Sequence, residues 1–210
     1  MLTYFEGVAM RARYRKGEGE RLRIELLEAA SQLLAEAGDP RDVSVRAVAE
    51  AVGVTSPSVY RHFPSKQDLV REVLALRFGE FRETLVAGAR GTSDAGERLL
   101  RACRAYVRLG LANPGHYRLL FSTAGMGPAG AGLGQGAPHP GAPSLATLIE
   151  LVADRVGDGV RSSPLALELW ASLHGIVDLR ITKPELDWPP EDDLIQLAVR
   201  ASDEAATNRA

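Results

Sequence analysis

Apolar residues recur every three or four positions along most of the chain, which is the periodicity of helices with one buried face. Between residues 20 and 37, for example, Ile24, Leu27, Ser31 and Leu34 fall on one side of the expected helix. No segment has a clear strand pattern, so we predict an all-α fold. The expected helices cover residues 20–37, 65–89, 95–112, 117–121, 144–156, 164–181 and 191–205, with two short helices between Ser44 and Phe63.

The most specific pattern in the chain is a pair of short helices separated by a tight turn. Ser44 is suited to cap the first helix, because its hydroxyl can accept a hydrogen bond from a backbone N–H one turn later. Gly53 follows that helix, at a position where the left-handed backbone favours glycine. The second helix begins at Thr55 or Ser56, with Pro57 tolerated in its first turn. This arrangement predicts a helix-turn-helix.

The second short helix has an apolar side and a polar side. Val59 and Phe63 face the core, whereas the outward residues are Ser56, Ser58, Arg61 and His62. A polar and basic outward face is suited to a groove of DNA. The next helix begins behind Ser65, whose spacing from Asp68 approximates a capping box. That helix is long enough to link a DNA-reading head to a C-terminal body.

The composition is that of an ordinary globular protein, and it carries no global signal for nucleic-acid binding. The 210 residues are 45% hydrophobic and 25% charged, with a net charge of −2 and a pI near 6.1. Any affinity for DNA must therefore come from a local patch. The N-terminal arm is one candidate, since Arg11, Arg13, Arg15, Lys16, Arg21 and Arg23 outweigh Glu18 and Glu20. Such an arm is either a solvated tail or, directly before a helix-turn-helix, a phosphate contact.

Several classes of function find no support in the sequence. Cys103 is the single cysteine, which excludes an intramolecular disulfide, and its apolar neighbours predict a core position. No apolar run reaches the length of a membrane span, and the N-terminus lacks the regions of a signal peptide, although Met10 is an alternative start. The four histidines, His62, His116, His139 and His174, show no metal-ligand spacing. We expect a cytoplasmic protein that is not an enzyme and needs no cofactor, metal or membrane.

The run VRAVAEAVGVTSPSVYRHFPSKQDLV, which begins at Val45, resembles the N-terminal DNA-binding segment of TetR-family transcriptional regulators. The resemblance covers about residues 20–70, and its most specific part is YRHFPSK, from Tyr60 to Lys66. Farther along, the run WASLHG from Trp170 resembles the Trp…His-Gly signature of the WHG-type TetR C-terminal domain. The resemblance implies a helix-turn-helix head joined to a helical body that binds an effector and dimerises.

The resemblance also implies which residues contact double-stranded operator DNA. The expected DNA-binding residues are Ser44, Arg46, Thr55, Ser56, Ser58, Tyr60, Arg61, His62 and Lys66. The small hydroxyl side chains at the start of the second short helix enter the major groove, and Tyr60, His62, Lys66 and Ser44 contact phosphates. Few of these side chains make bidentate base contacts, so part of the specificity rests on Arg46, Arg61 and DNA shape.

The expected helix 164–181 is apolar on two sides. One stripe contains Leu165, Leu169, Leu173 and Ile176, and the other contains Trp170, His174, Val177 and Ile181. A helix that is apolar over most of its circumference is buried on two sides, and one of them is suited to a second subunit. Together with helix 191–205 it predicts a four-helix homodimer interface, where the TetR family also dimerises. A two-fold dimer implies a near-palindromic operator.

Aromatic residues on several expected helices are candidates for an effector pocket. These residues are Tyr106, Tyr117, Phe121, Trp170 and His174. Apolar walls with few polar anchors favour an apolar or aromatic small molecule, although the same side chains can form an ordinary core. Residues 124–143 are rich in Gly, Ala and Pro and predict a flexible loop, either disordered or a gate of the pocket. One side of helix 95–112 carries Arg98, Arg101, Arg104 and Arg108, as a solvated face or a wall for an acidic effector.

These patterns together predict two domains, with the basic arm and helix-turn-helix in residues 1–66 and the effector-binding and dimerisation body in residues 67–210. The expected function is that of a ligand-responsive, sequence-specific DNA-binding regulator. We expect a repressor that a small molecule releases from its operator, while an activator or a regulator without an effector remains an alternative.

Overall fold

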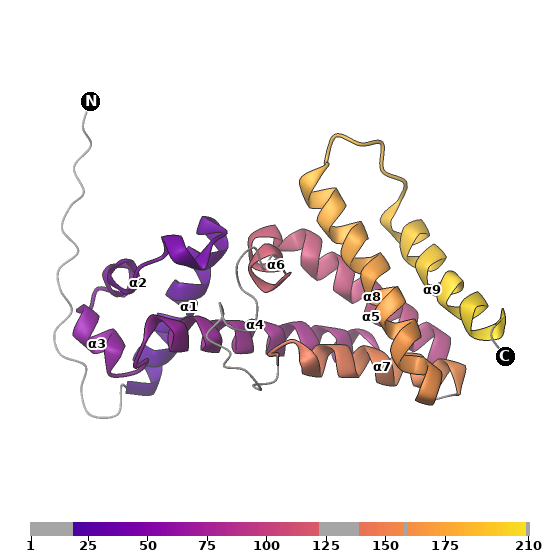
Figure 1. The fold of residues 1–210 in the computed structure, drawn as a ribbon, viewed down its shortest axis with the longest axis horizontal. Helices are drawn as coiled ribbons and strands as arrows, with labels where there is room; N and C mark the ends of the chain where they lie inside the picture. The colour runs from indigo at the N-terminus through magenta and orange to yellow at the C-terminus, as the bar shows by residue number, and fades with distance from the viewer. Residues whose placement is uncertain (1–18, 122–138, 158, 209–210) are drawn as a thin grey trace. The chain divides into compact units, whose positions relative to one another are not determined.

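The structure is a computed structural model and describes residues 19–121, 139–157 and 159–208 (Figure 1). Every regular element in these ranges is helical, which confirms the predicted all-α class. The elements are α1 (Gly19–Ala37), η1 (Pro40–Asp42), α2 (Val45–Val52), α3 (Ser56–Tyr60), α4 (Lys66–Gly88), α5 (Ala95–Ala112), α6 (Pro114–Phe121), α7 (Ala142–Val156), α8 (Gly159–Thr182) and α9 (Glu191–Asn208).

Prolines account for the two clearest differences between predicted and observed helix starts. α6 begins at Pro114 rather than at residue 117, because a proline fits the first position of a helix, where its missing N–H is not needed. We expected Pro164 to begin a helix, but α8 already starts at Gly159 and continues through this proline. The Pro164 ring is exposed, so it lies in the early part of α8 without entering the core.

The chain forms two compact units. Among the described residues, 19–74 and 118–121 belong to the first unit, which we call the head. Residues 75–117, 139–157 and 159–208 belong to the second, which we call the body. The predicted boundary between residues 66 and 67 lies at the first residue of α4, a helix that contributes to both units.

The head is organised around the inner face of α1, which packs against α2. The buried residues of α1 are Leu22, Leu26, Leu27, Ala30, Ser31 and Leu34. Our prediction that Ile24 belongs to this face was wrong, because its side chain is 59% exposed. At about 100° per residue, Ile24 lies well outside the arc centred on Leu26, Ala30 and Leu34.

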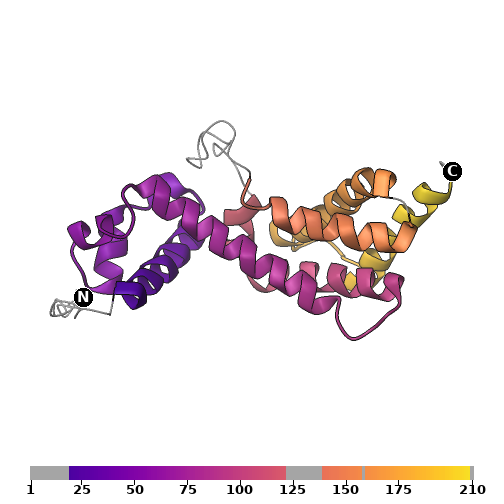
Figure 2. The same ribbon diagram turned by 90° about the horizontal axis from the view of Figure 1, so that it is seen from below.

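The body is a helical bundle in which α8 packs against α5, α7 and α9, and α5 also packs against α7 and α9 (Figure 2). Four residues of α8, spaced by one turn each, are buried: Leu165, Leu169, Leu173 and Val177. A fully buried aliphatic side chain of this kind contributes about 1.5–3 kcal/mol. Val177 was predicted in the second stripe, whose other members, Trp170, His174 and Ile181, are only half-buried, as is Ile176 of the first stripe. The second predicted stripe is therefore not closed by the described residues of one chain.

A glycine sets the closest approach of helices inside the body. A Cβ atom at Gly110 of α5 would lie 2.6 Å from Val177 Cγ1 of α8 and 2.9 Å from the ring of Tyr117 of α6. These contacts are shorter than side chains tolerate, so α5 needs glycine here. The sequence contained a signal that we did not use, since a glycine inside a helical pattern often marks close packing.

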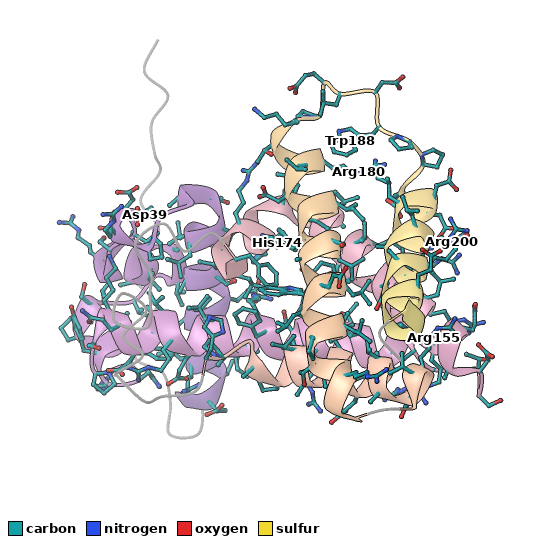
Figure 3. All side chains as sticks on the ribbon, turned by 45° about the vertical axis from the view of Figure 1, so that its right-hand side comes forward. Asp39, Arg155, His174, Arg180, Trp188 and Arg200 are labelled. Atoms are coloured by element: carbon teal, nitrogen blue, oxygen red, sulfur yellow. The ribbon has the colours of Figure 1, made fainter. Side chains whose placement is uncertain are left out.

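The connection between α8 and α9 is fixed by a stacked pair that Figure 3 labels. The Arg180 guanidinium lies 5.3 Å from the centre of the Trp188 ring and donates a hydrogen bond to the Pro189 carbonyl. Trp188 in turn donates from Nε1 to the Lys183 carbonyl over 2.9 Å. These contacts hold the short segment between the two helices. Within the part of the chain that the structure describes, no helix is long and apolar enough to cross a bilayer.

Candidate nucleic-acid interface and effector region

The first half of the predicted helix-turn-helix begins at a capped helix end. Ser44 caps α2 as predicted, and its Oγ accepts a hydrogen bond from the Ala47 N–H over 3.0 Å. Val45, Val48 and Ala49 bury the inner face of α2, so Ser44 and Arg46 remain exposed. The helix N-terminus adds unpaired backbone N–H groups and a partial positive charge. This end of α2 can therefore hold an anion such as a phosphate.

The turn and the second short helix present a continuous row of polar side chains. Gly53 ends α2 with φ of 74°, the left-handed conformation that its position requires. On α3, Thr55 Oγ1 lies 3.1 Å from Ser58 Oγ, and Arg61 Nη2 donates to the same Ser58 oxygen over 3.1 Å. Residues three apart share one face of a helix, so these three side chains form one outward surface.

The remaining predicted contacts of α3 flank this surface. Tyr60 is 50% exposed although it is a large aromatic residue, while Ser56 and His62 are half-buried. α3 ends at Tyr60, but the Phe63 N–H still bonds to the Val59 carbonyl over 2.9 Å, so the backbone keeps its helical turn through His62. Val59 and Phe63 are each 1% exposed, as predicted, and anchor this segment.

Lys66 stands at the first turn of α4, which Ser65 caps. Ser65 Oγ accepts from the Asp68 N–H over 3.1 Å and donates to the Asp68 carboxylate over 2.7 Å, so the predicted capping box is confirmed. The hydrogen bond from Ser65 lowers the pKa of Asp68. Lys66 Nζ donates to the Arg41 carbonyl over 3.2 Å, which ties the ammonium end of its side chain to η1.

Asp39 and Arg41, which sequence reasoning did not single out, bind each other at η1. Asp39, labelled in Figure 3, caps η1 by accepting from the Arg41 N–H over 2.8 Å. The Arg41 guanidinium also binds the Asp39 carboxylate, and this hydrogen bond lowers the pKa of Asp39. The signal was available, because an aspartate directly before a proline is a strong start for a helical turn.

Most described cations of the head pair with a nearby carboxylate. Arg21 pairs with Glu25 at 2.9 Å and Arg46 with Glu50 at 2.7 Å, each one turn away on the same helix. Within residues 19–74 and 118–121, Arg61, Lys66 and Arg118 form no ion pair. Arg61 and Lys66 belong to the predicted DNA-binding set, so two of these three unneutralised charges lie at the end of α3 and the start of α4.

The structure corrects one member of the proposed basic arm. Arg23 lies within α1, where its guanidinium stands 5.0 Å from the centre of the Phe63 ring and pairs with Glu72. This arginine covers the core residue of the helix-turn-helix instead of reaching outward. Arg21, another predicted member of the arm, lies on α1 and pairs with Glu25. The remaining members, Arg11, Arg13, Arg15 and Lys16, lie outside the described residues.

In the body, four of the five predicted effector residues form one aromatic cluster. The Tyr106 hydroxyl lies 3.0 Å from that of Tyr117, and the Tyr117 hydroxyl lies 2.7 Å from His174 Nδ1. The rings of Tyr117 and His174 stack at 5.5 Å, and Trp170 lies 6.0 Å from His174. Tyr106 and Tyr117 are buried, whereas Trp170 and His174 are half-buried.

Burial of this cluster keeps its groups neutral. Desolvation raises the pKa of Tyr106 to about 12 and raises that of Tyr117 further. Desolvation also lowers the pKa of His174, against the opposing effect of the Asp178 carboxylate. A neutral imidazole can accept a hydrogen bond from the Tyr117 hydroxyl at Nδ1. The cluster is thus an apolar patch that contains a short line of polar atoms.

The other sequence expectations for residues 67–210 have mixed outcomes: some are confirmed, some are not, and some fall outside the described residues. Phe121, the fifth predicted effector residue, is the last residue of α6 and belongs to the head unit. Of the loop expected at residues 124–143, residues 124–138 lie outside the described part of the chain. At its end, α7 begins at Ala142 and the His139 ring packs edge-on against Phe78. Cys103 is a core residue as predicted, because it is only 1% exposed, and this burial raises the pKa of its thiol to about 12.

The arginine stripe of α5 pairs with carboxylates. Arg98 Nη1 donates to Asp154 of α7 over 2.8 Å, and Arg101 pairs with Glu97 of α5 at 2.8 Å. Arg104 binds both carboxylate oxygens of Asp192 of α9, at 2.5 and 2.9 Å. The Arg108–Glu191 pair is longer, at 3.9 Å. Three of these arginines, Arg98, Arg104 and Arg108, thus connect α5 to α7 and α9. In the described parts of the chain, no three His, Cys, Asp or Glu side chains come together to hold a metal ion.

Two family models match the two parts of the chain that these sites occupy. The model described as "Bacterial regulatory proteins, tetR family" matches residues 26–73, and that described as "Tetracyclin repressor-like, C-terminal domain" matches residues 99–202. The first match contains α2, α3 and the start of α4. The second contains the Trp170–Gly175 run that resembled a TetR C-terminal signature.

Curated relatives agree with these matches. The HTH-type transcriptional repressor KstR2 of Rhodococcus jostii (strain RHA1) is 42% identical over 79 residues, which are 35% of this chain and 38% of that repressor. An uncharacterised HTH-type transcriptional regulator of Mycobacterium tuberculosis (strain ATCC 25618 / H37Rv) is 28% identical over 144 residues, 67% of this chain and 62% of that protein. The chain therefore matches less than two thirds of the length of either relative.

A solved structure supports the fold over nearly the whole chain. The fatty acid degradation regulator FadR from Bacillus halodurans superposes with a TM-score of 0.68 at 16% identity, covering 90% of this chain and 96% of that one. At this identity the likeness concerns the fold alone. The helix-turn-helix geometry, the two family models and the helical body lead to one conclusion: the chain belongs to the TetR family of bacterial transcriptional regulators.

Proposed function

We propose that this protein is a ligand-responsive transcriptional repressor that binds operator DNA as a homodimer and leaves it when a small molecule binds the body. The observation that carries this proposal is the exposed polar surface of α3, bordered by Arg61 and Lys66, which form no ion pair among the described residues. The name of the KstR2 relative, a repressor, supports the direction of regulation.

On this proposal, the α3 surface enters the major groove and phosphates bind around it. Thr55, Ser56 and Ser58 lie at the base edges, with Arg61 beside them. Tyr60, His62 and Lys66 contact phosphates on one side, and Ser44 holds a phosphate at the N-terminus of α2. Arg46 reaches DNA only after it leaves Glu50, because the two side chains form an exposed ion pair in the free protein.

The dimer is proposed to form through α8 and α9. These helices pack against each other and carry large apolar side chains on their outer surfaces. Leu167 and Leu179 of α8 are 45% and 46% exposed, and Leu197 of α9 is 58% exposed. The exposed Ala171 and the half-buried Gly175 lie between the two leucines of α8, and small residues there let a second copy approach closely. A two-fold pair of heads then requires a near-palindromic operator.

The effector is proposed to be an apolar or aromatic small molecule that binds beside the aromatic cluster. Trp170 and His174 are the cluster residues that a ligand would contact first, since they are only half-buried. Tyr106 and Tyr117 lie behind them, whereas Phe121 belongs to the head unit and is not part of the proposed site. The hydrogen bonds between the two tyrosines and His174 provide few but defined polar anchors. Release from DNA requires a coupling free energy of about 1–3 kcal/mol between the two sites.

The test begins with the DNA, because the operator is not yet known. Selection from a library of random duplexes, followed by gel-shift titration, should yield a near-palindromic site that the protein binds as a dimer. Light scattering should give a mass of twice 22.6 kDa at micromolar concentration. A library that yields no enriched sequence, or a protein that remains monomeric on its best site, would overturn the proposal.

The second step identifies the effector. Aromatic, lipid-like and acidic compounds are screened for an increase in unfolding temperature, and each hit is then tested for release of the selected DNA. A true effector stabilises the protein by mass action and lowers its affinity for DNA. Trp170→Ala and His174→Asn should weaken that effector without changing DNA binding. If every hit leaves the protein on its operator, the ligand-responsive part of the proposal is wrong.

A further inference from the structure

A second part of the body has the dimensions of a ligand site. A cavity of about 540 Å³ lies where the end of α4, the start of α5 and the middle of α7 come together. Cavities of this size hold small molecules in other proteins. Val86, Ala89 and Leu151 contribute apolar wall, and none of the five predicted effector residues lines the cavity. It is therefore separate from the aromatic cluster.

The charges around this cavity are balanced. Its wall includes two arginines, Arg90 and Arg98, and two carboxylates, Glu150 and Asp154. Arg98 and Asp154 already form an ion pair, with 2.8 Å between Nη1 and Oδ2. Another polar group of the wall is also engaged, because the Thr147 hydroxyl accepts from Arg82 over 3.2 Å and donates to the Pro143 carbonyl over 3.1 Å.

The other two charges have no such partner. Within the described part of the chain, the side chains of Arg90 and Glu150 form neither a hydrogen bond nor an ion pair, although both line the same cavity and both are exposed. Arg90 follows the end of α4, whereas Glu150 comes from α7, so the two charges belong to different walls. Each is therefore open to an opposite charge on a ligand.

We propose that this cavity binds a small zwitterion with an apolar centre, whose ammonium group pairs with Glu150 and whose carboxylate pairs with Arg90. A ligand with a single charge pairs with one of these residues and leaves the other without a partner. A polyanion is disfavoured as well, since the wall contains as many carboxylates as arginines. The apolar centre covers Val86, Ala89 and Leu151.

Four aromatic probes of nearly the same shape test the charge preference. They are 4-(aminomethyl)benzoate, 4-methylbenzoate, 4-methylbenzylamine and 4-methylbenzyl alcohol, titrated into the full chain by NMR or calorimetry. We expect the zwitterion to bind a few-fold to tenfold more tightly than either singly charged probe, since each exposed ion pair contributes only a small factor. If no probe binds at millimolar concentration, or if the alcohol binds as tightly as the zwitterion, the proposal is wrong.

Charge exchange makes the assignment specific to the two residues. Arg90→Glu should bind 4-methylbenzylamine best, and Glu150→Arg should bind 4-methylbenzoate best. The double variant should again prefer the zwitterion, which can bind in the reversed orientation. The matched controls are Glu83→Arg and Arg118→Glu, two exposed residues outside the cavity wall, and circular dichroism checks the fold of every variant.

The outcome of these titrations is independent of DNA binding, because they use the free protein. Single variants that keep the probe order of the unmodified chain would overturn the zwitterion site, even if the protein proves to be a repressor. Conversely, the expected exchange of preferences would support the site even if no operator were found.

Discussion

The proposed DNA-binding surface of the head and helix α5 of the body differ in how most of their arginines are paired. In the head, Arg46 pairs with Glu50 one turn away on the same helix, and Arg61 has no carboxylate partner among the described residues. In the body, Arg98 and Arg104 reach across to carboxylates of α7 and α9. Local pairs can open without disturbing the fold, whereas pairs between helices hold the fold together.

This difference separates residues suited to binding from residues suited to structure. The arginine stripe of α5 looked, from the sequence, like a solvated face or a wall for an acidic effector. Its long-range ion pairs instead assign Arg98 and Arg104 to the contacts between helices. In the head, by contrast, Arg61 and Lys66 keep their charge available for a phosphate. Four variants can break or sharpen this comparison.

The largest effect is expected from the packing of the body. Gly110→Ala should lower the free energy of unfolding by about 1–3 kcal/mol, because the new methyl group collides with buried Val177 and Tyr117. Chemical denaturation of the variant measures this loss.

Gly79→Ala is the matched control. Nothing lies within 4 Å of a Cβ atom at Gly79, which is exposed on α4. This variant should gain about 0.5–1 kcal/mol, because alanine has the higher helix propensity. A Gly110→Ala protein as stable as the unmodified chain would mean that α5, α6 and α8 are less closely packed than the structure indicates.

Much of the fold could be predicted from local patterns. The caps at Ser44 and Ser65, the turn at Gly53 and the bounds of α5 depend on neighbouring residues only, and all were predicted. The error at Ile24 and the missed role of Gly110 arose because both depend on which helices meet. Whether a side chain faces the core depends on its rotational position around the helix axis, which changes by about 100° with each residue. At the edge of an apolar stripe, the sequence alone defines this position poorly.

The second prediction concerns Lys66. Lys66→Gln should lower affinity for the selected operator roughly tenfold and reduce the slope of log K against log salt by about 0.9, as expected for one lost phosphate contact. Lys183→Gln in the body is the control, since it removes the same charge from an exposed position far along the chain. An unchanged slope in Lys66→Gln would remove Lys66 from the interface.

A smaller effect of opposite sign is expected at Glu50. Glu50→Gln frees Arg46 from its ion pair and removes a negative charge near the bound phosphates. Affinity for the operator should rise about two- to fivefold at low salt, an effect of the size of an exposed ion pair. Glu36→Gln, on α1, should change nothing. If Glu50→Gln weakens DNA binding, then the Arg46–Glu50 pair positions Arg46 for DNA instead of competing with it.

The two candidate sites differ in how much of each the sequence could predict. The proposed DNA contacts all fall within residues 44–66, so one contiguous pattern contains them. The aromatic cluster joins Tyr106, Tyr117 and His174 from three helices. Sequence periodicity indicated that these residues were partly buried, but it could not indicate that their polar atoms meet. That depends on the crossing of α5, α6 and α8, which side-chain packing decides.

The smallest effect tests the ties between helices in the body. The hydrogen bonds from Arg104 lower the pKa of Asp192 to about 2, below the value near 3.9 of an unfolded chain. A carboxyl with a lowered folded-state pKa stabilises the protein above its unfolded-state pKa, and this contribution is lost as the pH falls through its folded-state pKa. Asp192→Asn should therefore be slightly less stable than the unmodified chain from pH 5 to 8, and the difference should shrink between about pH 4 and pH 2. Asp193→Asn is the control, because Asp193 is exposed and has no ion pair among the described residues. Equal unfolding temperatures of the Asp192 and Asp193 variants across this range would show that the Arg104 pair does not hold α9 to α5, and the contrast between head and body would fail at that point.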